Sequence, residues 1–218
     1  YNLSNTGVFE RNIAATIGFN RIDYGVEDYY SLFKNEIGIL RASHIGGAED
    51  QGQAIASPVP SIINDFTYNI DAPRQDVTHH LARIKGFKNI ENIGLISLQY
   101  DYQQNNRLEF DVRRGSNKDK ASVDLVLDTQ TLTIDVASDI SEKLTTKFGI
   151  VGSLQTNYAN PETGVRRLIP DYDKYSIAGF ASGNYDINHK WVLEAGFRFD
   201  YTHMNVFKFY RRSFWQDR

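Results

Sequence analysis

Apolar and polar residues alternate along much of the chain, and this alternation predicts β-strands. In residues 9–20, FERNIAATIGFN, the odd positions are mostly apolar and the even positions are small or polar. Successive side chains of a strand point to opposite faces, so this segment would have one apolar and one polar face. A half-buried strand of a soluble protein has such faces. So does a strand of a membrane barrel, with lipid outside and water inside.

The same alternation predicts about seven strands, with a long irregular region after the first. The expected strands lie in residues 6–22, 77–88, 93–104, 121–138, 148–154, 175–185 and 191–201. Within the irregular region, residues 27–38, EDYYSLFKNEIG, have apolar side chains at helical spacing and predict a short helix. A second short helix is expected over residues 48–56, AEDQGQAIA, ended by Pro58.

The lengths of the connections favour a membrane barrel over a soluble domain. Long connections alternate with the short segments NIEN, SDISEK and DINHK. In an up-and-down sheet this alternation places every short turn at one end and every long loop at the other. Outer-membrane barrels have this arrangement, with short periplasmic turns and longer extracellular loops. We therefore expect an all-β, antiparallel transmembrane barrel, and the competing interpretation is an ordinary soluble β-domain.

The barrel interpretation assigns the apolar side chains to lipid and the opposite faces to a wet lumen. The expected lipid-facing residues are Ile13, Ala15, Ile17, Phe19, Leu98, Tyr100, Ile134, Leu193, Phe197 and Phe199. Arg11 shares this face and is expected near the periplasmic end, where its guanidinium can reach the interface. On the opposite faces, Asp135 and Arg198 would be costly in a packed core unless paired, but not in a wet lumen.

Composition narrows the alternatives further. The chain has 218 residues, a formal net charge of −3 and no cysteine. It therefore lacks the basic excess of a nucleic-acid-binding protein and cannot use thiolate or disulfide chemistry. No apolar run approaches the roughly 18 to 20 residues of a membrane helix, and the mean hydropathy is −0.45.

Candidate chemistry is sparse, so we do not expect an enzyme, and we expect no catalytic residues, cofactor or metal. His79 and His80 are neighbours on a strand and point to opposite faces, so they cannot chelate one metal together. Arginines in the long loops can bind anionic ligands bidentately. The candidate ligand-binding residues, all expected in extracellular loops, are Arg166, Arg167, His44, Tyr29, Tyr30, Arg113 and Arg114. The competing roles for the arginines are solvated loop charges and contact with lipopolysaccharide phosphates. For His44 the competing role is ordering of the loop, and for the tyrosines it is packing within the loop.

Two segments resemble the TonB-dependent outer-membrane receptors, nearest to Bacteroidetes-type receptors for ferric citrate and ferric siderophores. They are YGVEDYYSLFKNEIGILRASHIG, residues 24–46, and NYANPETGVRRLIPDYDKY, residues 157–175. The resemblance implies a barrel of about 22 strands filled by a plug. It also implies a location in the outer membrane of a Gram-negative bacterium and uptake of an iron chelate or another scarce nutrient.

The resemblance covers only the barrel. The chain starts at Tyr1 and shows no plug-like segment, so we expect residues 1–218 to be part of a larger barrel that contacts the TonB complex through a plug outside them. A structural role in an outer-membrane complex and an outer-membrane enzyme or adhesin remain the alternatives within the membrane, beside the soluble β-domain.

Overall fold

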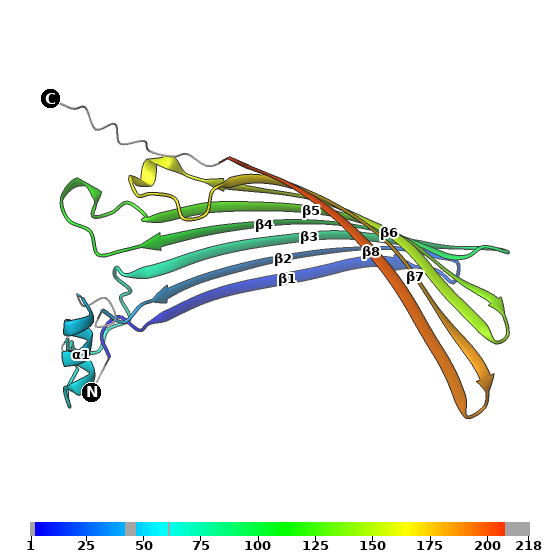
Figure 1. Cartoon of the computed structure of the whole chain (residues 1–218), viewed down its shortest axis with the longest axis horizontal. Helices are drawn as coiled ribbons and strands as arrows, with labels where there is room; N and C mark the ends of the chain where they lie inside the picture. Colours follow the sequence, from blue (N-terminus) through cyan, green and yellow to red (C-terminus); the bar gives the residue numbers. More distant parts are fainter. Residues whose placement is uncertain (1–2, 42–46, 61, 208–218) are drawn as a thin grey trace.

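The structure of the chain is a computed structural model that describes residues 3–41, 47–60 and 62–207. In this part of the chain, eight strands form one antiparallel sheet in which each strand pairs with the next in sequence. The strands are β1 (Val8–Asn20), β2 (Tyr24–Gly38), β3 (Arg74–Ile90), β4 (Gly94–Phe110), β5 (Val123–Ser141), β6 (Leu144–Ala159), β7 (Asp171–Asn188) and β8 (Trp191–Phe207). The sheet is strongly curved and twisted, and it does not close: β1 and β8 are its edges (Figure 1).

The helical segments of the described residues all lie in the long connections. Helix α1 (Ala48–Ala56) follows β2 and confirms the helix expected over these residues. At its start, the backbone N–H of Gly47 donates to the Asp50 carboxylate at 3.0 Å. Two short 3-10 helices, η2 (Gly115–Asn117) and η3 (Pro161–Thr163), lie in the next two long loops.

The prediction of a helix over residues 27–38 is wrong, because this segment belongs to strand β2. β2 pairs along its whole length with β1 on one side and with β3 on the other. Residues at helical spacing, such as Tyr29 and Phe33, also satisfy an alternating pattern. The backbone hydrogen bonds to two neighbouring strands outweigh the weak local preference. The sheet therefore has eight strands rather than seven.

The sorting of the connections by length is confirmed and becomes more complete. The short connections are residues 21–23, 91–93, 142–143 and 189–190, and the long ones are 39–73, 111–122 and 160–170. Figure 1 shows α1 and the loops at one end of the sheet and the tight turns at the other. Because β2 is an additional strand, β1 runs in the direction opposite to the expected one. Arg11 therefore lies towards the long-loop end, whereas it was expected near the short-turn end.

The register separates the sheet into an apolar face and a polar face. All of the residues expected to face lipid lie on the same face, which we call the apolar face. One row of paired residues on this face crosses all eight strands without a charged side chain: Phe19, Val26, Gly86, Leu98, Ile134, Ile150, Gly179 and Phe199.

The apolar face is the more exposed of the two. Ile17 is 75% exposed and Phe197 is 72% exposed, whereas Ser97 and Asp101 on the polar face are 9% and 7% exposed. In the central strands β4, β5 and β6 the polar-face side chains are the more buried. Because side chains crowd together on the inner side of a curved sheet, we infer that the polar face is the concave one. Among the described residues, the buried apolar side chains are small or cyclic, namely those of Pro73, Ala159 and Ala178.

Candidate ligand-binding site at the long-loop end

A cavity of about 400 Å³ lies where β4, β5 and β6 reach the long loops. Arg107 and Glu109 at the end of β4, Val123 and Leu125 at the start of β5, and Ala159 at the end of β6 all line it. These five residues belong to the polar face by register. The cavity therefore opens at the concave side of the sheet. The rest of its wall comes from Ser122 and Asp124 and from residues 160, 163 and 165–169 of the loop between β6 and β7.

Arg113 joins the two loops beside this cavity. Its Nη1 donates to the carbonyl oxygen of Thr163 at 2.9 Å, and to those of Lys120 and Ala121 at 3.4 and 3.3 Å. Thr163 is buried and belongs to η3, so the contact links the β4–β5 loop to a folded part of the β6–β7 loop. Arg113 thus orders the loops, a role that the sequence did not predict for the loop arginines.

Arg167 closes the base of the β6–β7 loop. Its Nη1 donates to the Ala159 carbonyl at 2.8 Å and to the Asp171 carboxylate at 2.9 Å. The same carboxylate accepts from the backbone N–H of Ala159 at 2.6 Å. Arg167 therefore joins the end of β6 to the start of β7, and a large part of its hydrogen-bonding capacity serves the loop itself.

The remaining charged side chains in the cavity wall differ in whether they have a partner within the protein. Arg107 and Glu109 form an ion pair, and Asp124 accepts from the Asn160 side chain at 2.8 Å. Arg166 is exposed and lines the cavity. It has no ion pair or hydrogen bond with another residue in the described part of the chain. The wall thus offers one guanidinium to a ligand that carries negative charge.

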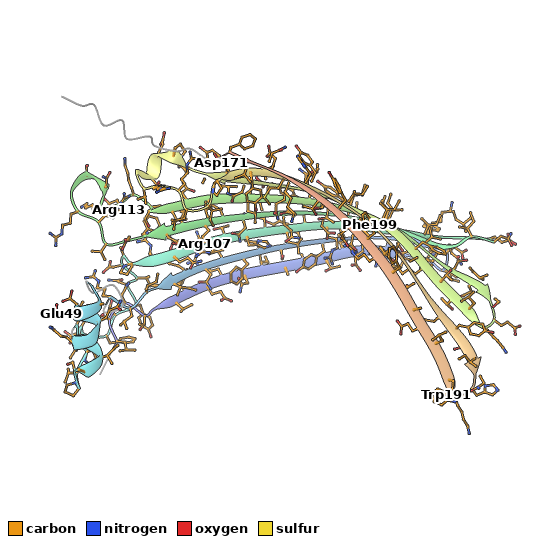
Figure 2. The ribbon with its side chains drawn as sticks, in the orientation of Figure 1. Glu49, Arg107, Arg113, Asp171, Trp191 and Phe199 are labelled. Carbon is orange, nitrogen blue, oxygen red and sulfur yellow. The ribbon has the colours of Figure 1, made fainter. Side chains whose placement is uncertain are left out.

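The structure brings only some of the expected site residues together. Arg166 and Arg167 line the cavity and Arg113 lies beside it, whereas Arg114 is exposed in the β4–β5 loop outside the lining. Figure 2 labels Arg107, Arg113 and Asp171 at the long-loop end, and Trp191 at the far end. His44 lies outside the described residues.

Tyr29 and Tyr30 were expected in a loop, but they are strand residues of β2. They point to opposite faces of the sheet, because they are neighbours on a strand. Tyr29 is paired with Thr16 and Arg83, and Tyr30 with Ala15 and Ala82, in the middle of the sheet. The sequence pattern did not single out Arg107, Glu109, Asp124 or Asn160, whose only signal was their position at strand ends next to long loops.

The polar face below the cavity is lined by charged and amide side chains that satisfy one another. Arg83 donates to Asp101 at 2.6 Å, and the Gln99 amide donates to the same carboxylate at 2.8 Å. Lys147 lies 3.2 Å from Asp135 across the next pair of strands. These residues include Asp135, which was expected on the face opposite the apolar side chains. Their partners explain how the polar face tolerates charges in the middle of long strands.

No family model and no curated protein matches the sequence. The described helices include none long and apolar enough to cross a membrane. In the same residues, no three His, Asp or Glu side chains lie together in a group that could hold a metal ion. What the site itself offers is a loop-enclosed cavity, open to the concave face, with Arg166 as its available cation.

Proposed function

We propose that this chain forms part of a transmembrane β-barrel in the outer membrane of a Gram-negative bacterium. The barrel is a TonB-dependent receptor that takes up a scarce nutrient by active transport, and its leading cargo is an anionic iron chelate of the ferric-citrate or ferric-siderophore type. It is a transporter rather than an enzyme. Coupling to TonB takes place through a plug outside these residues.

The exposed apolar face is the observation that carries the membrane assignment. Soluble monomers rarely expose contiguous apolar patches larger than a few hundred Å². Here a row without charges crosses eight strands, and large side chains on it such as Ile150 and Phe199 are 60% and 64% exposed. The strands have 13 to 19 residues, which exceeds the roughly 9–11 that a tilted strand needs to cross a membrane.

Tyrosines along the apolar face support the same assignment. The Tyr30 hydroxyl lies 2.9 Å from Nδ1 of His80, and the Tyr102 hydroxyl donates to Asp128 at 2.8 Å. In both pairs the polar partner lies one row closer to the long loops than the tyrosine. Tyr102 thus has the orientation of a tyrosine at the long-loop membrane interface, with an apolar ring towards lipid and a hydroxyl towards the polar side. Tyr30 lies next to Asp28, deeper in the apolar band.

The cavity supports an anionic cargo, and binding measurements test this part of the proposal. Ferric citrate is the anionic probe, and a neutral ferric hydroxamate is the comparison. Replacing Arg166 by Ala removes the available guanidinium and should weaken binding of ferric citrate about tenfold or more, because hydrogen bonds to charged groups contribute about 1.5–3 kcal/mol. The control is Arg114→Ala, since Arg114 is an exposed loop arginine outside the cavity.

The two variants separate a specific site from general attraction by loop charge. We expect Arg114→Ala to bind ferric citrate within about twofold of the unmodified protein. Equal losses in both variants would contradict a site at Arg166. Failure of the unmodified protein to bind or accumulate any ferric chelate, with and without a proton motive force, would reject iron transport.

A further inference from the structure

Asp28 is an acidic residue on the apolar face. By register it lies directly between Ile17 of β1 and Ile84 of β3, and its neighbours two residues away along β2 are Val26 and Tyr30. Its side chain is exposed. No other charged residue lies in its row, which continues through Tyr100, Leu132, Gly152, Ile177 and Tyr201.

A carboxylate on a lipid-facing surface is costly unless a cation compensates it. Among the described residues none forms an ion pair or a hydrogen bond with the Asp28 side chain. The charge also cannot turn into the lumen, because its position in the strand directs it to the apolar face. The compensating cation must therefore come from outside this part of the chain.

A hollow of about 490 Å³ lies next to Asp28 on the same face. Ile17 and Ile84 flank it at the level of Asp28, and the small side chains of Ala15 and Ala82 lie one row further towards the long loops. Apart from Asp28, the apolar-face side chains that line the hollow are aliphatic or tyrosine. The hollow thus has an acidic end and an apolar floor that leads from it towards the middle of the sheet.

The acidic end faces the short-turn side of the membrane. Asp28 is the fifth residue of β2, which starts at Tyr24 after the short turn. With a rise of about 3.4 Å per residue and a tilt of about 40°, its carboxylate lies roughly 10 Å above that turn. Lipid headgroups of the short-turn leaflet are therefore nearer to it than those of the other leaflet.

We propose that this hollow binds a phospholipid with a primary-amine headgroup. The ammonium group pairs with the Asp28 carboxylate, and an acyl chain lies on Ala15 and Ala82. This assignment rests on the membrane location in the proposed function. A lipid fits better than a protein partner because Asp28 is the one charged side chain that the hollow offers on this face. Thr16, Tyr29 and Arg83 also line the hollow, but their positions in the strands direct their side chains to the polar face, where Arg83 pairs with Asp101.

The test uses the intact protein in vesicles of equal parts phosphatidylethanolamine and phosphatidylglycerol. After gentle detergent extraction, native mass spectrometry measures which lipid stays bound. We expect selective retention of phosphatidylethanolamine. Asp28→Asn should reduce this retention about tenfold or more by removing the charge, and Ala82→Leu should reduce it by filling the hollow. The matched controls are Asp173→Asn and Ala195→Leu, on the same face outside the hollow.

Two results would overturn the lipid site while leaving the receptor in place. One is a protein that inserts into the vesicles but retains both lipids equally, or retains them unchanged in Asp28→Asn and Ala82→Leu. The other is a second protein cross-linked through a reactive group placed at position 28. A protein that stays soluble without detergent and does not insert would overturn both the lipid site and the proposed function.

Discussion

At the scale of single residues, two phenylalanine rings on the polar face lie over glycines of neighbouring strands. A Cβ added to Gly149 would lie 2.3 Å from Cζ of Phe180, and one added to Gly25 would lie 2.6 Å from Cε1 of Phe87. Each pair is also a direct register pair, Gly149 with Phe180 and Gly25 with Phe87. The glycines are therefore needed because the rings occupy the space that a side chain would take.

We predict that Gly149→Ala destabilises the protein by about 1–3 kcal/mol, the usual cost of overpacking. The Phe180 ring would have to leave its position, and the Ile134 carbonyl oxygen, 3.0 Å from the added Cβ, limits any backbone adjustment. Urea unfolding in lipid vesicles measures the change. Gly152→Ala, in the same strand, is the control, since nothing lies within 4 Å of its added Cβ. Equal stabilities of the two variants would contradict this explanation.

We also predict that Arg113→Ala loosens the loops around the cavity. The substitution removes the donor to the carbonyls of Lys120, Ala121 and Thr163, which is the link between the two loops. Limited proteolysis should then cleave residues 111–122 several-fold faster than in the unmodified protein. Arg114→Ala is the control, and a cleavage rate unchanged in Arg113→Ala would show that other contacts order the loops.

At the scale of the element, each strand presents two chemically different surfaces to its surroundings. In β6, Ile150 lies on the apolar face, and its neighbour Val151 lies on the polar face between Thr133 and Ala178. Both are β-branched aliphatic residues in the middle of a strand that is paired on both sides. They therefore form a matched pair for testing which face meets lipid.

We predict that Ile150→Arg strongly impairs folding into vesicles, whereas Val151→Arg is better tolerated. An arginine on the lipid face costs about 2–4 kcal/mol near the middle of the bilayer, while on the polar face it adds a cation near Asp135, one row away on β5. The yield of folded, heat-modifiable protein measures the difference. If Val151→Arg were the more damaging variant, the polar face would not be a wet lumen.

At the scale of the whole molecule, the apolar surface crosses the strands obliquely. On β1 the apolar side chains continue from Phe19 up to Ile13 towards the long loops. On β8 they reach only Tyr201, which shares the row of Ile17. Asn205 on β8 already occupies the row of Ile13. An apolar band of constant height in the membrane crosses the strands obliquely in this way when the strands tilt by about 35–45° against the membrane normal.

We predict that the long loops face the outside of the cell and the short turns face the periplasm. The sequence has no cysteine, so single cysteines can be labelled without background from these residues. A membrane-impermeant maleimide should label Lys118→Cys in the β4–β5 loop of intact cells, but not Lys190→Cys in the β7–β8 turn. Labelling of only the turn would reverse the orientation, and equal labelling of both would argue against a sealed membrane.

The two open edges lead to a further expectation for the whole molecule. In the described residues, β1 and β8 each pair on one side only, and lipid offers no hydrogen bonds to unpaired strand edges. We therefore expect further strands to complete the barrel, so that the unboiled native protein migrates as a heat-modifiable species well above the 24.9 kDa of this chain. A detergent-independent species of this mass would support a soluble β-domain instead.

Local pattern was enough to predict the all-β class, six strands of the sheet besides β1, helix α1 and the faces on which the apolar residues lie. It failed at β2, where side chains such as Tyr29, Leu32 and Phe33 fit both a helical and an alternating spacing. That one omission also misplaced Arg11 and both tyrosines expected in a loop. The arginines at the long-loop end were located correctly, but the division of their roles between Arg113, Arg166 and Arg167 depends on contacts across loops.

The sequence by itself determined which side chains share a face of each strand, because alternation is a property of the extended backbone. It also determined that the long connections gather at one end, because strand directions alternate along an up-and-down sheet. Only the tertiary structure decided that β2 is a strand, since its state depends on hydrogen bonds to two partners. It alone brought Asp28 between Ile17 and Ile84 and put Phe180 over Gly149, because register between strands is set by pairing across the sheet.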